Sequence, residues 1–204
     1  MAAVSLKKGQ KISLTKENAG LDKVIVGLGW DAAEKESKGG FRSMFKAKPA
    51  NIDCDASALM LKNGKLIKNE DIVYFGRLKH ASGSVQHMGD NLTGDGAGDD
   101  EQIIVELSRV PQEYDRIIVV ANIYQARQRK QDFGMIKNAY IRIMDGNTNR
   151  ELCIYNLSDN YDDMSAMIFG ELYRRDNEWK FNAIGSGFQG GLAALCGHYG
   201  IEVA

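Results

Sequence analysis

Short runs of β-type residues, separated by turn residues, recur along this chain. About ten of them can be read from the pattern, at residues 11–14, 23–30, 55–62, 71–75, 102–107, 116–124, 139–145, 151–157, 165–174 and 178–185. Several alternate with a period of two: in AYIRIMD, Ile141 and Ile143 point to one side and Arg142 to the other. Helical periodicity is weak except near 192–199, and crossover helices for a parallel sheet are missing. The sequence therefore predicts a mainly β fold, an antiparallel β-sandwich with one or two short helices, including a C-terminal helix.

Turn residues join some of these runs directly. MDGNTNREL and YRRDNEW each place turn chemistry between two runs, and both predict hairpins. IGSGFQGG matches the G-x-G-x-x-G of dinucleotide-binding proteins, but only 14 residues follow Gly190 in the 204-residue chain. This leaves no room for the second strand of a βαβ unit. We expect a glycine-rich turn that packs the last helix on the sheet.

Composition restricts the class of protein. The chain is 44% apolar and 26% charged, with a net charge of −1, so no general attraction to nucleic acid or membrane is expected. Its three cysteines are far apart and odd in number, which indicates buried, reduced thiols. The N-terminus has no signal-peptide pattern, and the longest apolar run is too short to span a bilayer. We expect a cytoplasmic protein forming a single domain over residues 1–204.

An acidic, glycine-rich stretch, GDNLTGDGAGDDE at 89–101, holds five carboxylates and four glycines. Like charges repel, so either a solvated linker or a bound cation would account for it. Carboxylate, amide and hydroxyl oxygens suit Ca²⁺, which accepts six to eight oxygens in irregular geometry. An EF-hand is excluded, because its invariant glycine is replaced by Asp95.

A second acidic group favours the cation. In NIDCDASALML, Asp53 and Asp55 share one face with Ser57 and Leu59, and Cys54 faces the other way. Aspartate is depleted in strands, so such a pair is unfavourable unless something binds it. Asp31 follows another β run. Eight acids from three segments could thus converge, enough for two neighbouring ions; Asp55→Asn or Asp99→Asn would relieve repulsion in the empty site.

Two further features carry less weight. Residues 32–51 are basic and contain two phenylalanines; contact with RNA or a membrane surface is open, but a solvated loop insertion between two strands is the simpler interpretation. His80 and His87 have no recognised metal-ligand spacing, and we expect them to be partly exposed.

Taken in order, KVIVGLGWD, IDCDASALML, HMGDNLTGDGAGDDEQI, NAYIRIMD and GELYRRDNEWKFNAIGSGFQGGL resemble the TerD family of tellurium-resistance and stress proteins. The resemblance covers about residues 6–203. It implies a β-sandwich that binds Ca²⁺, usually two ions, without an established catalytic activity. It also implies a role in tellurite resistance and stress responses, with other tellurium-resistance proteins in membrane-linked complexes as partners.

The resemblance also marks the metal-binding residues. The acidic motifs fall on Asp31, Asp53, Asp55, Asp90, Asn91, Thr93, Asp95, Asp99, Asp100 and Glu101. Asn51 stands where the family often has an acid, and the basic insertion is longer than in compact members. A metal-dependent hydrolase or nuclease, using the same carboxylates around two ions, is the alternative function.

Overall fold

The computed structural model describes residues 3–32, 52–89 and 98–201. Nearly all of the basic insertion predicted at 32–51 lies outside this part of the chain. Four of the predicted metal ligands also lie outside it: Asp90, Asn91, Thr93 and Asp95.

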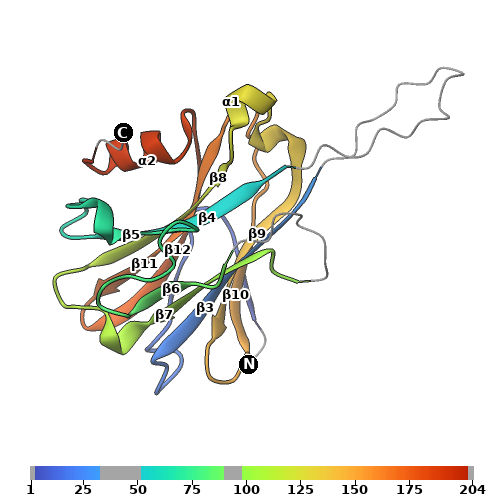
Figure 1. Ribbon diagram of the computed structural model, residues 1–204. Coiled ribbons are helices and arrows are strands. Elements are labelled where there is room, and N and C mark those ends of the chain that lie inside the picture. Colours follow the sequence, from blue (N-terminus) through green and yellow to red (C-terminus); the bar gives the residue numbers. More distant parts are fainter. Residues whose placement is uncertain (1–2, 33–51, 90–97, 202–204) are drawn as a thin grey trace, which may run out of the picture.

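The described strands form two six-stranded sheets that face each other (Figure 1). Sheet A has the order β1-β10-β9-β3-β7-β6, and its strands are β1 (Val4–Leu6), β3 (Lys23–Ala32), β6 (Val85–His87), β7 (Glu101–Glu106), β9 (Ile136–Asp145) and β10 (Glu151–Asn156). Sheet B has the order β2-β12-β11-β8-β4-β5, and its strands are β2 (Lys11–Ser13), β4 (Cys54–Leu61), β5 (Ile72–Val73), β8 (Arg116–Ile123), β11 (Ala166–Arg175) and β12 (Glu178–Phe188).

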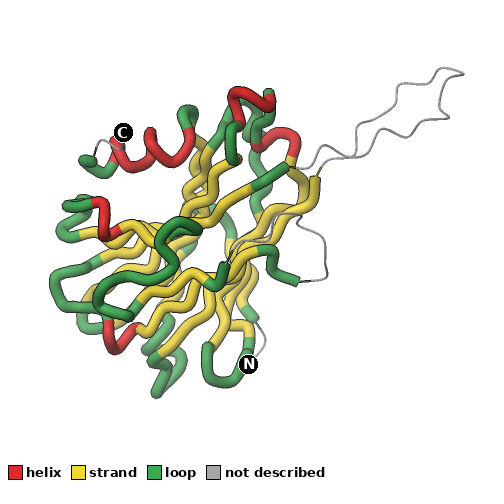
Figure 2. Tube along the Cα trace, in the orientation of Figure 1, coloured by secondary structure: helices red, strands yellow, loops and turns green. Residues whose placement is uncertain are grey.

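The predicted antiparallel sandwich is confirmed. Each predicted run contains a strand, and every pairing between named strands is antiparallel except that of β1 with β10. The pattern missed β1 and β6, which have only three residues each. Figure 2 shows the helices in red: α1 (Ala126–Arg129), the predicted C-terminal helix α2 (Gly191–His198) and the 3₁₀ turns η1 (Asn69–Asp71), η2 (Leu107–Arg109) and η3 (Phe133–Met135).

Both predicted hairpins are present. β9 pairs with β10, and β11 pairs with β12 through Asp176 and Asn177, which have φ values of 56° and 59°. Two left-handed residues in a two-residue loop match the twist of the strands they join. The glycine-rich turn is shorter than predicted, because β12 continues to Phe188. Gly190 and Gly191, with φ values of 95° and 68°, make the turn into α2.

The main core lies between the sheets, and a second core lies outside sheet B. Alternate residues of β3, such as Val24, Val26 and Leu28, point into the main core. Leu195 and Cys196 of α2 cover the outer face of sheet B, where they meet residues of β4, β8 and β11. All three cysteines are buried and form no disulfide, as predicted. Within the described residues, no helix has the length and apolar character needed to cross a membrane.

Each sheet ends in very short edge strands. β1 and β6 border sheet A with three residues each, while β2 and β5 border sheet B with three and two. The 3₁₀ turn η1 leads directly into β5.

Several chain segments meet at one end of the sandwich. Strand register places Leu28 opposite Glu101 and Ala32 opposite Ile136, so β3 ends where β7 and β9 begin. In sheet B, β4 begins opposite the end of β8. Ala56 N of β4 donates a hydrogen bond to Glu101 at the start of β7, so the start of β4 in sheet B lies beside the start of β7 in sheet A. We call this the acidic end, defined by Asp31, Asp53, Asp55, Asp99, Asp100 and Glu101.

Candidate metal site

The side chains of three consecutive acids at the start of β7 point in three different directions. Asp99 lies on the outer face of sheet A, Asp100 holds the backbone of β3, and Glu101 reaches from sheet A to sheet B. Alternation along an extended strand would put Asp99 on the same side as Glu101, but Asp99 and Asp100 precede β7 in a bent stretch of backbone, and Asp99 turns to the opposite face. The three carboxylates therefore have different partners.

Asp99 is fully engaged by neighbouring side chains. Its Oδ1 accepts hydrogen bonds from Arg142 Nε at 2.7 Å and Tyr140 Oη at 3.0 Å, and its Oδ2 accepts one from Gln102 Nε2 at 2.9 Å. The hydrogen bond to Asp99 raises the pKa of the Arg142 guanidinium. The carboxylate lies directly over Gly27, where a Cβ atom would be only 2.1 Å from Oδ2. Asp99 thus holds the C-terminal end of the acidic stretch at 89–101 against sheet A.

Asp100 and Glu101 bind backbone amides. Trp30 N donates to Asp100 Oδ2 at 2.7 Å, and Ala56 N donates to Glu101 Oε2 at 2.5 Å. β5 pairs with β4 only at Ala58 and Leu59, so Glu101 serves the edge of β4 that β5 does not reach. His87 Nε2 lies 3.2 Å from the same Glu101 oxygen. Glu101 therefore connects the two sheets at the acidic end.

The predicted ligands on β3 and β4 are close to this junction. Asp53 pairs with Arg129 Nη1 at 3.3 Å, and Asp31 Oδ2 accepts a hydrogen bond from Asn138 Nδ2 at 2.7 Å. Asp55 is 4% exposed and receives a long contact from Asn122 Nδ2 at 3.4 Å.

Four of these carboxylates lie close enough to the Cys54 thiol to raise its pKa. Its pKa is raised well above the ordinary value, first by burial and then by the negative charges of Asp55, Glu101, Asp53 and Asp100. These acids come from β4 or the residue before it and from the start of β7, so they belong to both sheets. Asp99 is not among the causes, which agrees with its position on the outer face of sheet A.

The described acids do not make a complete metal site by themselves. Among residues 3–32, 52–89 and 98–201, no three His, Cys, Asp or Glu side chains form a group that could hold an ion. Oxygens of other residue types are available, however. Ser57 Oγ and Asn122 Oδ1 are both buried and have no hydrogen-bond partner, and Asn122 lies directly opposite Asp55. Hard oxygen donors beside a buried carboxylate fit Ca²⁺.

The two histidines are buried, so the prediction of partial exposure is wrong. His87 is 1% exposed and His80 is 4% exposed. The reason is that each ring has a carboxylate partner inside the protein. For His87 this partner is Glu101, and for His80 it is Asp71.

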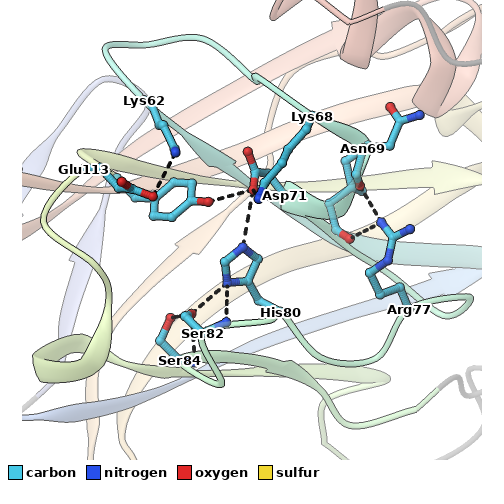
Figure 3. A network of polar contacts seen from close by, with 11 residues as sticks. Lys62, Lys68, Asn69, Asp71, Arg77, His80, Ser82, Ser84 and Glu113 are labelled. Atoms are coloured by element: carbon cyan, nitrogen blue, oxygen red, sulfur yellow. Dashed lines mark hydrogen bonds and ion pairs between the residues drawn. The ribbon is translucent and has the colours of Figure 1, made fainter.

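Asp71 is at the centre of a second polar network (Figure 3), and it directly precedes β5, which pairs with β4 at Ala58 and Leu59. Its Oδ1 accepts a 2.7 Å hydrogen bond from Tyr114 Oη and lies 3.4 Å from His80 Nε2. The other ring nitrogen of His80, Nδ1, lies 2.7 Å from Ser82 Oγ. These contacts connect η1 to the segment that precedes β6 and close the side of the sandwich between the two edge strands.

Sequence reasoning missed the residues that organise the site. Arg142 and Asn122 are polar residues within distant strands, and nothing in their spacing connects them to the acids, whereas alternation already placed Ser57 on the face of Asp55. Register would have been needed, because Asn122 faces Asp55 only through the pairing of β8 with β4. The alternation in NIDCDASALML did correctly place Cys54 on the face opposite Asp55.

The fold and the acidic end define a class of protein: a two-sheet β-sandwich with carboxylates from both sheets gathered at one end. The TerD domain matches residues 1–199, and the chain belongs to the TerD family. It is 54% identical over 186 residues to stress response protein SCP2 of Bacillus subtilis (strain 168), covering 91% of this chain and 92% of that protein. It is 41% identical over 203 residues to tellurium resistance protein TerD of Serratia marcescens, covering 99% of this chain and 100% of that protein.

A solved structure has the same fold. It is a homologue of telluride resistance protein (TerD) from Streptomyces coelicolor A3(2), superimposed with a TM-score of 0.61 at 21% identity. The match covers 87% of this chain and 96% of that one.

Proposed function

We propose that this protein is a cytoplasmic, calcium-binding stress-response protein that contributes to tellurite resistance without catalysing a reaction. The observation that carries the proposal is the convergence of Asp53, Asp55, Asp100 and Glu101 around Cys54. Four carboxylates drawn from two sheets repel one another at neutral pH, and a divalent cation would offset that repulsion.

The outer face of β4 and the junction between the sheets offer two separate places for an ion. Asp55 belongs to the outer face of sheet B, whereas Glu101 lies between the sheets. Two ions therefore suit this arrangement better than one. Other tellurium-resistance proteins are the proposed partners, because the curated relatives include proteins with that name.

Thermal unfolding tests calcium binding. A ligand that binds only the folded state stabilises it by about 2.7 kcal/mol at a hundredfold excess over Kd. For a domain of roughly this size, 1 kcal/mol raises the melting temperature by about 2–4 °C. Saturating Ca²⁺ is expected to raise the melting temperature by at least ~5 °C relative to chelator; an unchanged melting temperature would contradict the proposal.

Two further experiments address the rest of the proposal. Deleting the gene in its host should lower tolerance to tellurite, and the wild-type chain should restore it. Purified protein with Mg²⁺ or Mn²⁺ should not turn over phosphoesters or nucleic acids. Turnover that disappears in Asp55→Asn would instead establish the metal-dependent hydrolase.

A further inference from the structure

One segment of the chain, between β4 and the residues that follow β6, carries most of the exposed large apolar side chains. They are Ile67, Phe75, Leu78 and Met88, with exposed fractions from 45% to 55%. The rest of the described chain exposes only Val4, Tyr124 and Met135 in this way. Exposed apolar side chains that gather on one part of a soluble protein mark a surface that binds a partner.

Hydrogen bonds hold the turn that carries Phe75. Tyr74 and Arg77 exchange two backbone hydrogen bonds, so Phe75 is at the tip of a two-residue turn. The Arg77 guanidinium also donates to the carbonyl oxygen of Asn69, which ties the turn to η1 (Figure 3). The turn therefore displays Phe75 in a fixed position.

The Asp71 network supports the rest of the segment. The ring of His80, two residues after Leu78, contacts the buried Asp71 carboxylate. His87 N donates to Leu78 O at 2.8 Å, which pairs Leu78 with the residue before Met88. The backbone that carries the exposed apolar side chains is thus already ordered, so docking of these side chains costs little conformational entropy.

The exposed charges of the same segment are mostly positive. Its basic side chains are Lys65, Lys68, Arg77 and Lys79, of which Arg77 is half-buried and the lysines are exposed. Residues 62–89 contain only two acids, Glu70 and Asp71, and Asp71 is completely buried. The net charge of −1 gives the whole chain no general attraction to an anionic surface, but this segment has a local one.

The shape of the segment favours a bilayer over a partner helix. Phe75 is at the tip of a turn, and Ile67 and Met88 lie outside strands. Neither the cleft between α1 and α2 nor the pocket beside η3 and β9 includes any of the four apolar residues. An amphipathic helix needs an apolar groove, whereas a bilayer accepts protruding apolar side chains and attracts the basic ones around them.

We propose that the exposed apolar and basic side chains of residues 65–88 dock this protein directly on an anionic lipid bilayer. The apolar side chains enter the headgroup region, and the lysines lie beside lipid phosphate groups. This surface goes beyond the proposed function and needs no calcium, so its failure leaves calcium binding untouched.

Co-sedimentation with lipid vesicles in chelator tests the proposal. The vesicles contain either phosphatidylcholine alone or equal parts of phosphatidylcholine and phosphatidylglycerol, and wild type should sediment only with the second kind. Phe75→Ser should weaken the partition coefficient about tenfold, because it removes an apolar anchor. Lys65→Gln combined with Lys79→Gln should weaken it about 25-fold, since each basic side chain near an anionic membrane contributes about fivefold.

Val4→Ser is the matched apolar control. Val4 is 44% exposed, close to the value for Phe75, but it lies in β1, at the opposite edge of sheet A from β6. Lys7→Gln combined with Lys16→Gln is the charge control, because both lysines are exposed and lie outside the segment. Both controls should bind the anionic vesicles within twofold of wild type.

Three results would overturn the proposal. Wild type that binds neither kind of vesicle would leave the segment to a protein partner. Binding that appears only when Ca²⁺ is added would mean that the ion bridges acids of the protein to lipid phosphates. Binding that survives both Phe75→Ser and the lysine pair would place the lipid contact elsewhere. Should Phe75→Ser melt below wild type, Leu78→Ser takes its place, with the same loss expected.

Discussion

Asp99 and Arg142 form an ion pair on the outer face of sheet A, with 2.7 Å between Oδ1 and Nε and none of the Asp99 side chain exposed. The pair connects the start of β7 to β9, with β3 between them in the sheet. Removing either partner leaves a charge without its counter-ion in a place that water reaches poorly.

Arg142→Gln is expected to lower the free energy of unfolding by roughly 2–3 kcal/mol, because the Asp99 carboxylate loses its cation. Urea unfolding in chelator measures this. Arg109→Gln is the control: Arg109 pairs with Glu106 but its side chain is 57% exposed, so a change below about 1 kcal/mol is expected. Equal effects of the two substitutions would show that burial of the Asp99 pair does not matter.

Gly27→Ala should be destabilising by roughly 1–3 kcal/mol, since the new Cβ would take the position of the Asp99 carboxylate. Gly197→Ala provides the comparison. Gly197 is in α2 with open space around its Cβ position, and alanine there is expected to stabilise by about 0.5–1 kcal/mol. Thermal unfolding of both variants in chelator would show the opposite signs.

Asp55→Asn and Asp99→Asn are expected to behave differently. Asp55→Asn should reduce the rise in melting temperature caused by Ca²⁺, and in chelator it should melt at or above the wild-type temperature because it relieves repulsion near Glu101. Asp99→Asn should melt below wild type in chelator, because Arg142 loses its counter-ion. The sequence alone treats both aspartates as ligands; identical melting curves for the two variants would support that simpler interpretation.

Calcium should be preferred over magnesium. The candidate donors come from β4, β8 and the start of β7, so they form an irregular set rather than an octahedron. Mg²⁺ demands nearly ideal octahedral geometry and retains its waters. Competition titration should show much weaker Mg²⁺ binding, and comparable affinities would argue against the site.

The thiols should be unreactive in the folded protein. Burial raises the pKa of Cys153 to about 12 and that of Cys196 to about 11, and the pKa of Cys54 is also raised. At pH 8 almost no thiolate is present, so a thiol reagent should label the cysteines only after denaturation. Rapid labelling of the native protein would contradict this.

It follows that tellurite tolerance should not depend on thiol chemistry. Replacing all three cysteines by Ala or Ser, with the fold retained, should leave any protection of cells intact. Protection that vanishes in a folded triple variant would show that a thiol takes part.

The sequence predicted the fold because a period of two and turn residues are local signals. MDGNTNREL and YRRDNEW specify hairpins without reference to the rest of the chain, and the amphipathic run at 192–199 specifies a helix. β6 was missed since three residues, VQH, are too few to show a period. Gly185 and Gly187 were placed in a turn because glycine usually marks one, but the chain continues there as β12, where Tyr155 and Met164 lie too close for a Cβ atom at these positions.

The site was predictable only in part. Charge density is visible in sequence, so the acid-rich stretches could be singled out as candidate ligands. The partners of those acids are not visible, since Arg142 meets Asp99 across 43 positions and Ala56 meets Glu101 across 45. Whether an aspartate is a free ligand or a structural anchor depends on such distant partners.

The short edge strands have a consequence for behaviour at high concentration. A long exposed edge offers a row of unpaired backbone groups on which another molecule can extend the sheet, and this is how many β proteins begin to form fibrils. In the described part of this chain, the outermost strands of both sheets have only two or three residues each. Each outermost strand therefore gives a second molecule little backbone on which to extend the sheet.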